Sequence, residues 1–478
     1  MARIWHFKLK LRSRGRKAMK GFMRFGWALL GLIMTTAALP AAADWTGARG
    51  TVALRSDTFV SPDFDATTAK QYGFFFAGLQ TAGVSRQSRL ESMESGLQAQ
   101  IDGQFSPSQT TLSYLNIRQL YHQEGFLSVG RKLENWSQLD ERWNLGIYQP
   151  QFRWNPLRPE SQGLTGIFAR LNGDSEKVPW GLLLFGSMIA IPDQGAGYSV
   201  KNGQFESVNP WFNPPPKSGR FESTGAVDEF RYDVMKPDTN KIIFNQSFAA
   251  QFFIGEIGNG FSFQAAYAYK PSNQLSLAAD GRIIPGNQID VKINPNIYYH
   301  SVVSADLQYA SDLYEIGVGA LRDKPQDPEF DKEWTYRTFG QSDMISPFVG
   351  VRLGLVKLRA MSITINGPDE GAAGPKATEL GDILQHRYTT TSAQAVEASA
   401  RFFWKRHEGL TGRVRYTRGA SGEFESVLGD LAYQLDSRWS LGASAILARV
   451  EQNELARKTV YSEYENNDLV QAGVTYVF

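Results

Sequence analysis

Apolar residues recur at every second position over much of this chain, and no apolar stretch after residue 43 reaches the length of a membrane helix. Near the C-terminus, Val470, Ala472, Val474 and Tyr476 alternate with small or polar residues. Side chains of a β-strand point alternately to its two faces, so this period predicts strands with one apolar and one water-facing side. The sequence therefore favours an all-β protein.

The segments between the predicted strands alternate in length. Short connections are predicted at 436–438, 407–409, 356–357, 311–312 and 270–273. Long ones are predicted near 453–466, 369–389, 323–339, 193–225 and 138–162. Short turns on one rim and long loops on the other are typical of transmembrane barrels. Two short connections, 258–260 and 106–109, fall on the long side, and residues 226–235 fit either a strand or a loop.

Aromatic residues cluster at the predicted strand ends, as in Tyr298 and Tyr299, where membrane interfaces favour amphipathic rings. A soluble sandwich alternates too, but one that spans residues 44–478 without a domain break would be unusual. We therefore predict one domain over 44–478. It is a transmembrane antiparallel up-and-down β-barrel of about 18 strands (range about 16 to 20), with short periplasmic turns and long extracellular loops.

Residues 1–43 differ from the rest of the chain. Nine of the 50 Lys and Arg residues lie between Arg3 and Arg24 without any acidic residue, followed by the apolar run 25–38 and Ala41 to Ala43. This order predicts a cleavable secretory signal peptide that ends at Ala43. An uncleaved anchor is the alternative, although the apolar run is short for a membrane span.

Removal of this segment makes the chain acidic. It leaves 41 Lys and Arg against 48 Asp and Glu, a net charge of −7 in place of +2. The basic character belongs to the targeting segment, so no nucleic-acid partner is expected. Cysteine is absent, which excludes disulfides, thiolate metal ligands and cysteine catalysis.

The residue types give little support to catalysis. The five histidines are scattered, and no His-x-x-x-His, Gly-x-Ser-x-Gly or phosphate-loop motif occurs. We therefore expect no enzyme, no cofactor and no bound metal.

Charged residues of both signs fall on the water-facing side of the predicted strands. An unpaired charge on the lipid face is costly near the middle of the bilayer, so an aqueous lumen explains them. The predicted pore-lining residues are Arg118, Arg170, Arg282, Arg352, Arg401, Arg413, Arg415, Asp102, Asp280, Asp306, Glu315, Glu397 and Asp430. The basic residues around Arg352, Arg401, Arg413 and Arg415 either set solute preference in a constriction or pair within the wall and stiffen it.

Two long loops combine aromatic residues with polar groups. Their aromatic residues include Trp136, Trp143, Trp154, Trp211 and Phe212. Such rings suit stacking on sugars, but they also suit a loop that packs on itself or folds into the lumen as a plug or eyelet. The prolines Pro214 to Pro216 stiffen the second loop.

The last predicted strand, 468–478, ends in an aromatic residue. Together with the wall pattern, it makes the chain resemble the Gram-negative outer-membrane porin-like barrels, whose last strand typically ends in Phe or Trp. The resemblance is architectural and assigns no specific family. It implies that Tyr476 and Phe478 form a membrane-insertion signal, with outer-membrane lipid, lipopolysaccharide and the barrel insertion machinery as partners. Assembly into a homo-oligomer is compatible with it.

The leading hypothesis is an outer-membrane channel for diffusion or selective passage of small hydrophilic solutes or saccharides, reached after export through the inner membrane. One alternative is a barrel that exports or assembles surface polysaccharide, suggested by the aromatic loops and the strand number. Another is a plugged surface barrel, an adhesin or an enzyme, whose lumen is closed by residues 193–225.

Overall fold

The structure is a computed structural model, and its compact unit is Arg49–Phe478. The residues described are 48–61, 71–81, 86–88, 91–93, 96–105, 112–173, 178–195, 197–207, 209, 211–220, 227–286, 288–327, 330, 333–367, 370–373, 387–388, 390, 392–406, 408–420, 422–451 and 459–478. The predicted signal peptide, 1–43, lies outside them. Within these ranges, no helix is long and apolar enough to cross a membrane.

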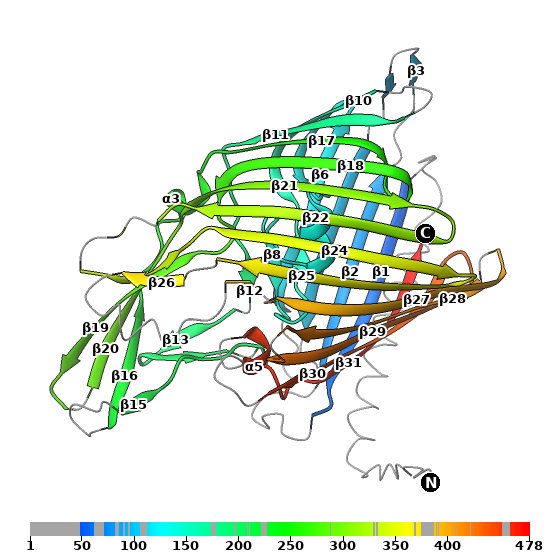
Figure 1. The fold of residues 1–478 in the computed structure, drawn as a ribbon. Coiled ribbons are helices and arrows are strands. Elements are labelled where there is room, and N and C mark those ends of the chain that lie inside the picture. Colours follow the sequence, from blue (N-terminus) through cyan, green and yellow to red (C-terminus); the bar gives the residue numbers. More distant parts are fainter. Residues whose placement is uncertain are drawn as a thin grey trace, which may run out of the picture. The chain divides into compact units, whose positions relative to one another are not determined.

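Eighteen strands form one sheet whose first and last strands, β1 and β31, pair with each other (Figure 1). The sheet is therefore a closed barrel, which confirms the predicted fold class and strand number. The wall strands are β1 (Ala48–Phe59), β2 (Gln71–Thr81), β5 (Gly96–Phe105), β6 (Leu112–Glu124), β7 (Leu127–Lys132), β10 (Leu164–Gly173), β11 (Trp180–Ser187), β17 (Ser247–Glu256), β18 (Asn259–Pro271), β21 (Tyr299–Ala310), β22 (Tyr314–Pro325), β24 (Ser342–Leu353), β25 (Val356–Asn366), β27 (Ala393–Lys405), β28 (Glu408–Gly419), β29 (Phe424–Gln434), β30 (Trp439–Val450) and β31 (Leu469–Val477).

The two faces of the wall differ as the alternation predicts. In β21, Val303, Leu307 and Tyr309 are 41–49% exposed on the outer face, whereas Ser304 and Asp306 are buried on the inner face. In β31, Val470 is exposed, whereas the neighbouring Gln471 is buried. The side-chain amide of Gln471 donates a hydrogen bond to the Asp57 carboxylate of β1 at 2.9 Å. Apolar residues therefore form the outer surface, and polar residues line the lumen.

The connections alternate in length along most of the wall. Short turns join β6 to β7, β17 to β18, β21 to β22, β24 to β25, β27 to β28 and β29 to β30. Longer connections at the opposite rim carry further strands and helices, which gather at one end of the barrel (Figure 1). We call these ends the short-turn rim and the long-loop rim. At the long-loop rim, the connection between β28 and β29 is short.

A second sheet is built entirely from the long loops. It consists of β15 (Ser218–Arg220), β16 (Val227–Val234), β20 (Gln288–Asn296), β19 (Ser276–Ile284), β23 (Thr335–Phe339) and β26 (Glu370–Ala373). The remaining elements outside the wall are α2 (Gln138–Trp143), α3 (Thr239–Ile243), α5 (Val460–Glu463), β3 (Arg86–Ser88), β4 (Glu91–Met93), β8 (Gln151–Arg153), β9 (Glu160–Ser161), β12 (Gln194–Gly195), β13 (Ser199–Lys201) and β14 (Gln204–Glu206).

This loop sheet corrects two sequence predictions. Residues 270–273 do not form a tight turn: 272–298 is a long connection, and β19 and β20 pair with each other, with β16 and with β23. The short connection at 257–258 accordingly lies on the short-turn rim and breaks no pattern. The prediction was wrong because a strand shows period two in any sheet, so the period cannot say which sheet it joins.

Substitution of adjacent residues tests which face of the wall meets lipid. We expect Leu307→Arg to lower the free energy of unfolding in lipid vesicles by ~2 kcal/mol, because the charge would enter hydrocarbon. Gln308→Arg, whose side chain faces the lumen at nearly the same depth, is the matched control and should cost much less. Urea titration of the refolded barrel measures both, and equal effects would contradict the assignment of the faces.

Candidate functional site

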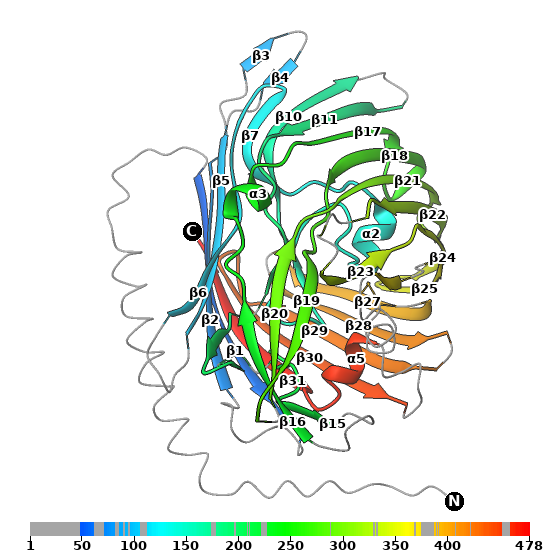
Figure 2. The ribbon, with the colours of Figure 1, turned by 90° about the vertical axis from the view of Figure 1, so that its left-hand side faces the viewer.

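Residues 133–163, which we call the constriction loop, join β7 to β10 and fold into the lumen. They carry α2, β8 and β9, and α2 lies inside the ring of wall strands (Figure 2). Trp136, Leu139 and Tyr148 of this loop are each at most 1% exposed and pack against inward-facing wall residues such as Phe168 and Phe185. These apolar residues of the loop therefore fill the lumen beside β10 and β11.

Asp306 of β21 anchors the start of α2. Its carboxylate accepts hydrogen bonds from the Ser137 hydroxyl at 3.1 Å, from the Gln138 backbone N–H at 2.9 Å and from the Leu139 backbone N–H at 3.1 Å. The first N–H groups of a helix have no partner within the helix, and a negative charge at that end is favourable. One wall carboxylate therefore fixes the helix terminus inside the barrel.

Further wall residues hold the rest of the loop. The Trp143 indole N–H donates to the Ser346 hydroxyl of β24 at 2.8 Å. The Tyr148 hydroxyl lies 2.9 Å from the Ser304 hydroxyl of β21. The Arg415 guanidinium of β28 donates to the Arg142 carbonyl at 2.7 Å and lies over the Trp143 ring. Anchors from three wall strands make the constriction loop a fixed part of the lumen.

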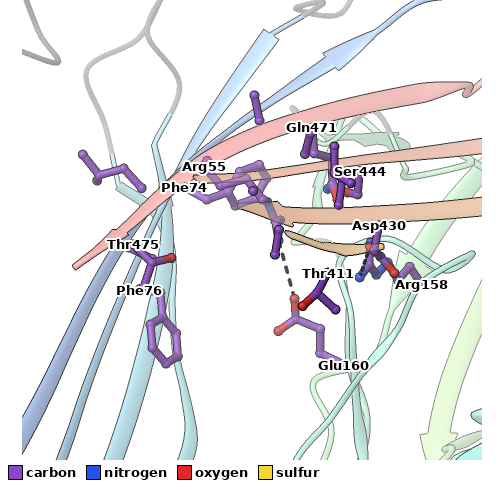
Figure 3. Close-up of a pocket in the computed structure, with 18 of the residues that line it drawn as sticks. Arg55, Phe74, Phe76, Arg158, Glu160, Thr411, Asp430, Ser444, Gln471 and Thr475 are labelled. Carbon is purple, nitrogen blue, oxygen red and sulfur yellow. Dashed lines mark hydrogen bonds and ion pairs between the residues drawn. The ribbon is translucent and has the colours of Figure 1, made fainter. Parts of the chain in front are cut away.

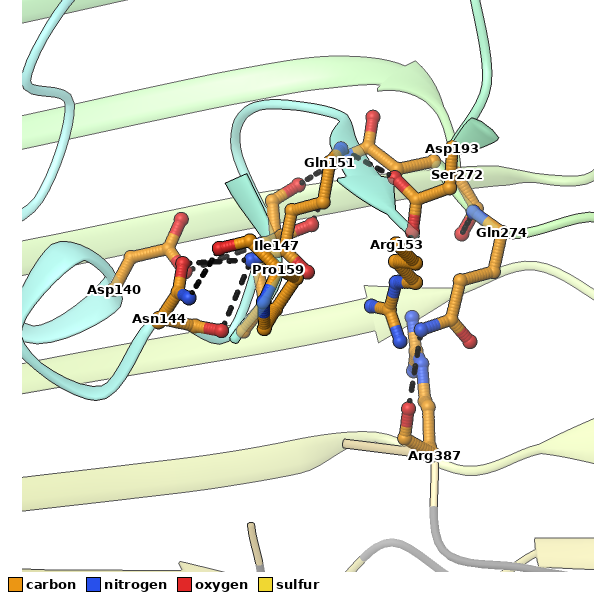
Figure 4. A network of polar contacts seen from close by, with 12 residues as sticks. Asp140, Asn144, Ile147, Gln151, Arg153, Pro159, Asp193, Ser272, Gln274 and Arg387 are labelled. Atoms are coloured by element: carbon orange, nitrogen blue, oxygen red, sulfur yellow. Dashed lines mark hydrogen bonds and ion pairs between the residues drawn. The ribbon is translucent and has the colours of Figure 1, made fainter. Parts of the chain in front are cut away.

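The loop is also tied to segments of the long-loop rim (Figure 4). Asp193 accepts a hydrogen bond from the Gln151 backbone N–H at 2.7 Å and pairs with Arg153 at 2.8 Å. There, β12 pairs in parallel with β8. Asn273 donates to the Ile147 carbonyl at 3.0 Å. The long loops and the constriction loop thus form one bonded assembly.

Three of the cavities in the described part of the lumen lie beside the constriction loop and share lining residues. Cavity I has a volume of about 520 Å³ and lies between this loop and the wall strands β28–β31, β1 and β2 (Figure 3). Cavity II (about 420 Å³) shares Arg118 and Arg413 with cavity I, and cavity III (about 330 Å³) shares Glu141 and Arg413 with cavity II. The shared lining makes the three neighbours along one path.

Basic side chains outnumber acidic ones along this path. The basic lining residues are Arg55, Arg118, Arg142, Arg158, Lys357, Arg359, Arg413 and Arg415. The acidic ones are Glu141, Glu160, Glu315, Glu397 and Asp430.

Most of the acidic residues are already paired. Glu315 binds Lys357 at 2.7 Å and Arg359 at 2.6 Å. Glu397 binds Arg413 at 2.6 Å, and Asp430 binds Arg158 at 2.8 Å. These pairs neutralise the carboxylates of the wall and leave the excess charge positive.

Arg118 lies at a β-bulge. The register between β5 and β6 shifts at Ile101, so that Gln100 faces Gln119 and Ile101 faces Ile117, with Arg118 as the extra residue. A bulge redirects side chains locally. The backbone carbonyl of Arg118 accepts a hydrogen bond from the Gly163 backbone N–H at 3.1 Å. The Nε–H of the Arg118 side chain donates a hydrogen bond to the Ser161 carbonyl at 3.3 Å. Within the described residues it forms no ion pair.

The protein environment shifts the titration of three residues of α2. Desolvation, followed by repulsion from Asp140, raises the pKa of Glu141 to about 7, although its side chain touches the open lumen. Burial raises the pKa of Asp140 to about 6. Burial lowers the pKa of the Arg142 guanidinium to about 10, still well above neutral pH, and its Nη1 has no hydrogen-bond partner among the described residues. Glu141 therefore changes charge near neutral pH at the centre of the path.

Six of the predicted pore-lining residues meet at the cavities. They are Arg118, Arg413, Arg415, Glu315, Glu397 and Asp430. Asp306 faces the lumen but caps α2, and Arg170 pairs with Glu134 at 2.5 Å at the start of the constriction loop.

The other predicted residues lie elsewhere. Arg352 and Arg401 are exposed near the short-turn ends of β24 and β27 and line none of the three cavities. Asp102 lies on β5, and its side chain is outside the described part of the structure. Asp280 and Arg282 lie on β19 of the loop sheet, so the prediction that they belong to wall strands was wrong.

Several lining residues were missed. Lys357 and Arg359 alternate with the exposed Leu358 on β25, so the period of two could have found them. Arg142 and Arg158 belong to the constriction loop, where no period indicates that a side chain reaches the lumen.

The loop aromatics are packed rather than open. Trp136, Trp143, Trp154 and Trp211 are at most 7% exposed, and Phe212 stacks on Tyr198 with ring centroids 5.6 Å apart. Trp211 packs against Phe59 and Tyr464. These contacts favour the packing role over open sugar platforms. Among the described residues, no group of three or more His, Asp or Glu could hold a metal ion.

The closed sheet, its apolar outer face and the loop folded into a charged lumen decide the architecture. The chain is a porin-like β-barrel. No protein-family model matches it, and no curated protein matches in sequence.

The barrel is similar to several solved structures. OccAB4 of Acinetobacter baumannii has a TM-score of 0.42 and 11% identity, covering 91% of this chain and 98% of its own. OpdL of Pseudomonas aeruginosa has a TM-score of 0.46 and 10% identity, covering 90% and 98%. OmpF of Salmonella typhi, in complex with daunomycin, has a TM-score of 0.37 and 10% identity, covering 90% and 97%.

Asp306→Asn tests the anchor of the constriction loop. The asparagine amide cannot accept hydrogen bonds from all three donors, the Ser137 hydroxyl and the backbone N–H groups of Gln138 and Leu139. We therefore expect the free energy of unfolding to fall by ~1–3 kcal/mol. Limited proteolysis should cut within 133–163 faster than in the unsubstituted protein. Asp280→Asn on the loop sheet is the control, and identical cleavage of Asp306→Asn and control would contradict the anchoring role.

Proposed function

We propose that the protein is an outer-membrane channel for small hydrophilic solutes with a preference for anions. The path of cavities I to III beside the constriction loop, with its excess of basic residues, carries this proposal. Rings of charged side chains at a narrow point select permeant ions by their sign. The wall ion pairs hold much of the negative charge, so a passing anion meets guanidinium groups that are not fully neutralised.

The surroundings of the channel belong to the same proposal. Residues 1–43 act as a signal peptide removed after Ala43, and the short-turn rim faces the periplasm. The C-terminal Phe478 is 60% exposed and exchanges backbone hydrogen bonds with Gly50 at 2.8 and 2.9 Å, so the strand that the insertion machinery would bind also closes the barrel. Lipopolysaccharide surrounds the long-loop rim, and a homo-oligomer is compatible with the apolar outer wall.

Single-channel recording tests the proposal. We expect the refolded residues 44–478 to give a stable open current in a planar bilayer, with a reversal potential of the anion-selective sign in a salt gradient. Arg118→Gln combined with Arg413→Gln should shift the reversal potential toward cation preference, because two positive charges leave the path. Arg282→Gln, on the loop sheet, is the control and should leave it unchanged.

A cation-selective current from the unsubstituted barrel would contradict the anion preference. A silent but correctly folded barrel would contradict the channel itself and would favour a plugged surface protein, because the constriction loop occupies much of the lumen.

The selectivity should also depend on pH. Glu141 is negative above its pKa of about 7 and neutral below it. Lowering the pH from about 8 to about 6 therefore removes a negative charge from the path and should increase the preference for anions. In Glu141→Gln the preference should already be high at about pH 8 and should change less with pH. A pH response that persists in full in this variant would assign the effect to another group.

A further inference from the structure

Cavity I differs from the other two because much of its lining is apolar (Figure 3). Phe74 and Phe76 of β2 lie on one side of it. Phe74 is nearly buried beneath the Arg55 guanidinium, whose carbon lies 4.3 Å from the ring centroid, whereas Phe76 is half-buried. The lumen thus contains a recess whose lining is largely apolar.

The floor of the recess consists of small side chains on neighbouring strands. Ala432 of β29 lies opposite Gly442 of β30, and Gly442 lies opposite Gly473 of β31. All three face the lumen, since Asp430 and Ser444 of the same strands point inward. A Cβ atom at Gly442 would meet no heavy atom within 4 Å. The missing side chain at Gly442 therefore leaves the recess open.

Positive charge borders the same recess. Arg118, Arg158 and Arg413 line cavity I together with Glu160 and Asp430. Asp430 is engaged by Arg158 at 2.8 Å, as Figure 3 shows. Arg118 has no ion pair among the described residues, and its Nη atoms make no hydrogen bond there, so it can bind an anion.

We propose that cavity I is a binding subsite for organic anions that carry a hydrophobic ring or short alkyl group. The inference rests on the proposed channel function and specifies which anions it favours. The acidic group binds at Arg118 and Arg413, and the apolar group enters the recess over Gly442, where it displaces water from apolar surface. Weak binding on the path increases the occupancy of the permeant solute without trapping it.

Permanently charged probes test the subsite. Unlike weak acids, they have no neutral form that could cross the lipid without using the channel. Bi-ionic reversal potentials in planar bilayers give the permeability of benzenesulfonate relative to methanesulfonate. The larger benzenesulfonate diffuses more slowly in water than methanesulfonate. A permeability for benzenesulfonate that equals or exceeds that for methanesulfonate therefore indicates binding. We expect Gly442→Leu, which fills the recess, to lower this ratio at least about threefold.

Gly429→Leu is the matched control. It makes the same substitution on the adjacent strand β29, where a Cβ atom also meets nothing within 4 Å, but on the outer face of the wall next to the inward-facing Asp430. The ratio should not change in this variant. As a charge control, benzyltrimethylammonium carries the ring on a cation and should permeate less than benzenesulfonate.

The outcomes separate the two proposals. A conducting channel with equal ratios in the unsubstituted protein and in Gly442→Leu would overturn the subsite and leave the channel standing. Preferred passage of benzyltrimethylammonium would overturn the role of the arginines. A folded barrel without current would overturn both.

Discussion

The backbone pairing of β1 with β31 is the constraint on which the rest of the structure depends. In hydrocarbon an unpaired N–H or C=O group is costly, so a sheet can cross a membrane only if it has no free edge. Nine residue pairs join the two strands, from Thr51 with Val477 to Phe59 with Leu469. Closure fixes which residues face lipid and which face water, and it creates an interior too wide for the wall side chains to fill.

The constriction loop fills part of that interior, and its position decides where a path remains. Its aromatic residues are packed among inward-facing residues of the wall, while Asp306, Ser346 and Arg415 bond to its polar groups. Where the loop faces β29, β30 and β31, these strands present small residues such as Ala432 and Gly442, which leave cavity I open.

The same arrangement sets the electrostatics of the lumen. Carboxylates that serve the fold are engaged: Asp306 holds a helix terminus, and Glu315 and Glu397 pair with basic residues of other wall strands. Arginines that reach the cavities are less fully matched, since Arg118, which lies on a bulge, forms no ion pair among the described residues. Packing of the loop and the excess of positive charge along the path are thus two results of the same interior.

The sequence by itself determined the class of fold, an approximate strand number and the two faces of each strand, because period two is a local property of the chain. It also placed Arg413, Arg415 and Asp430 inside the lumen. Only the tertiary structure decided that β19 and β20, and with them Asp280 and Arg282, belong to the loop sheet and not to the wall. It also decided that Arg142 and Arg158 of the constriction loop line the path. The choice of a strand's partner and the course of a loop depend on contacts between residues far apart in the chain, which no local period records.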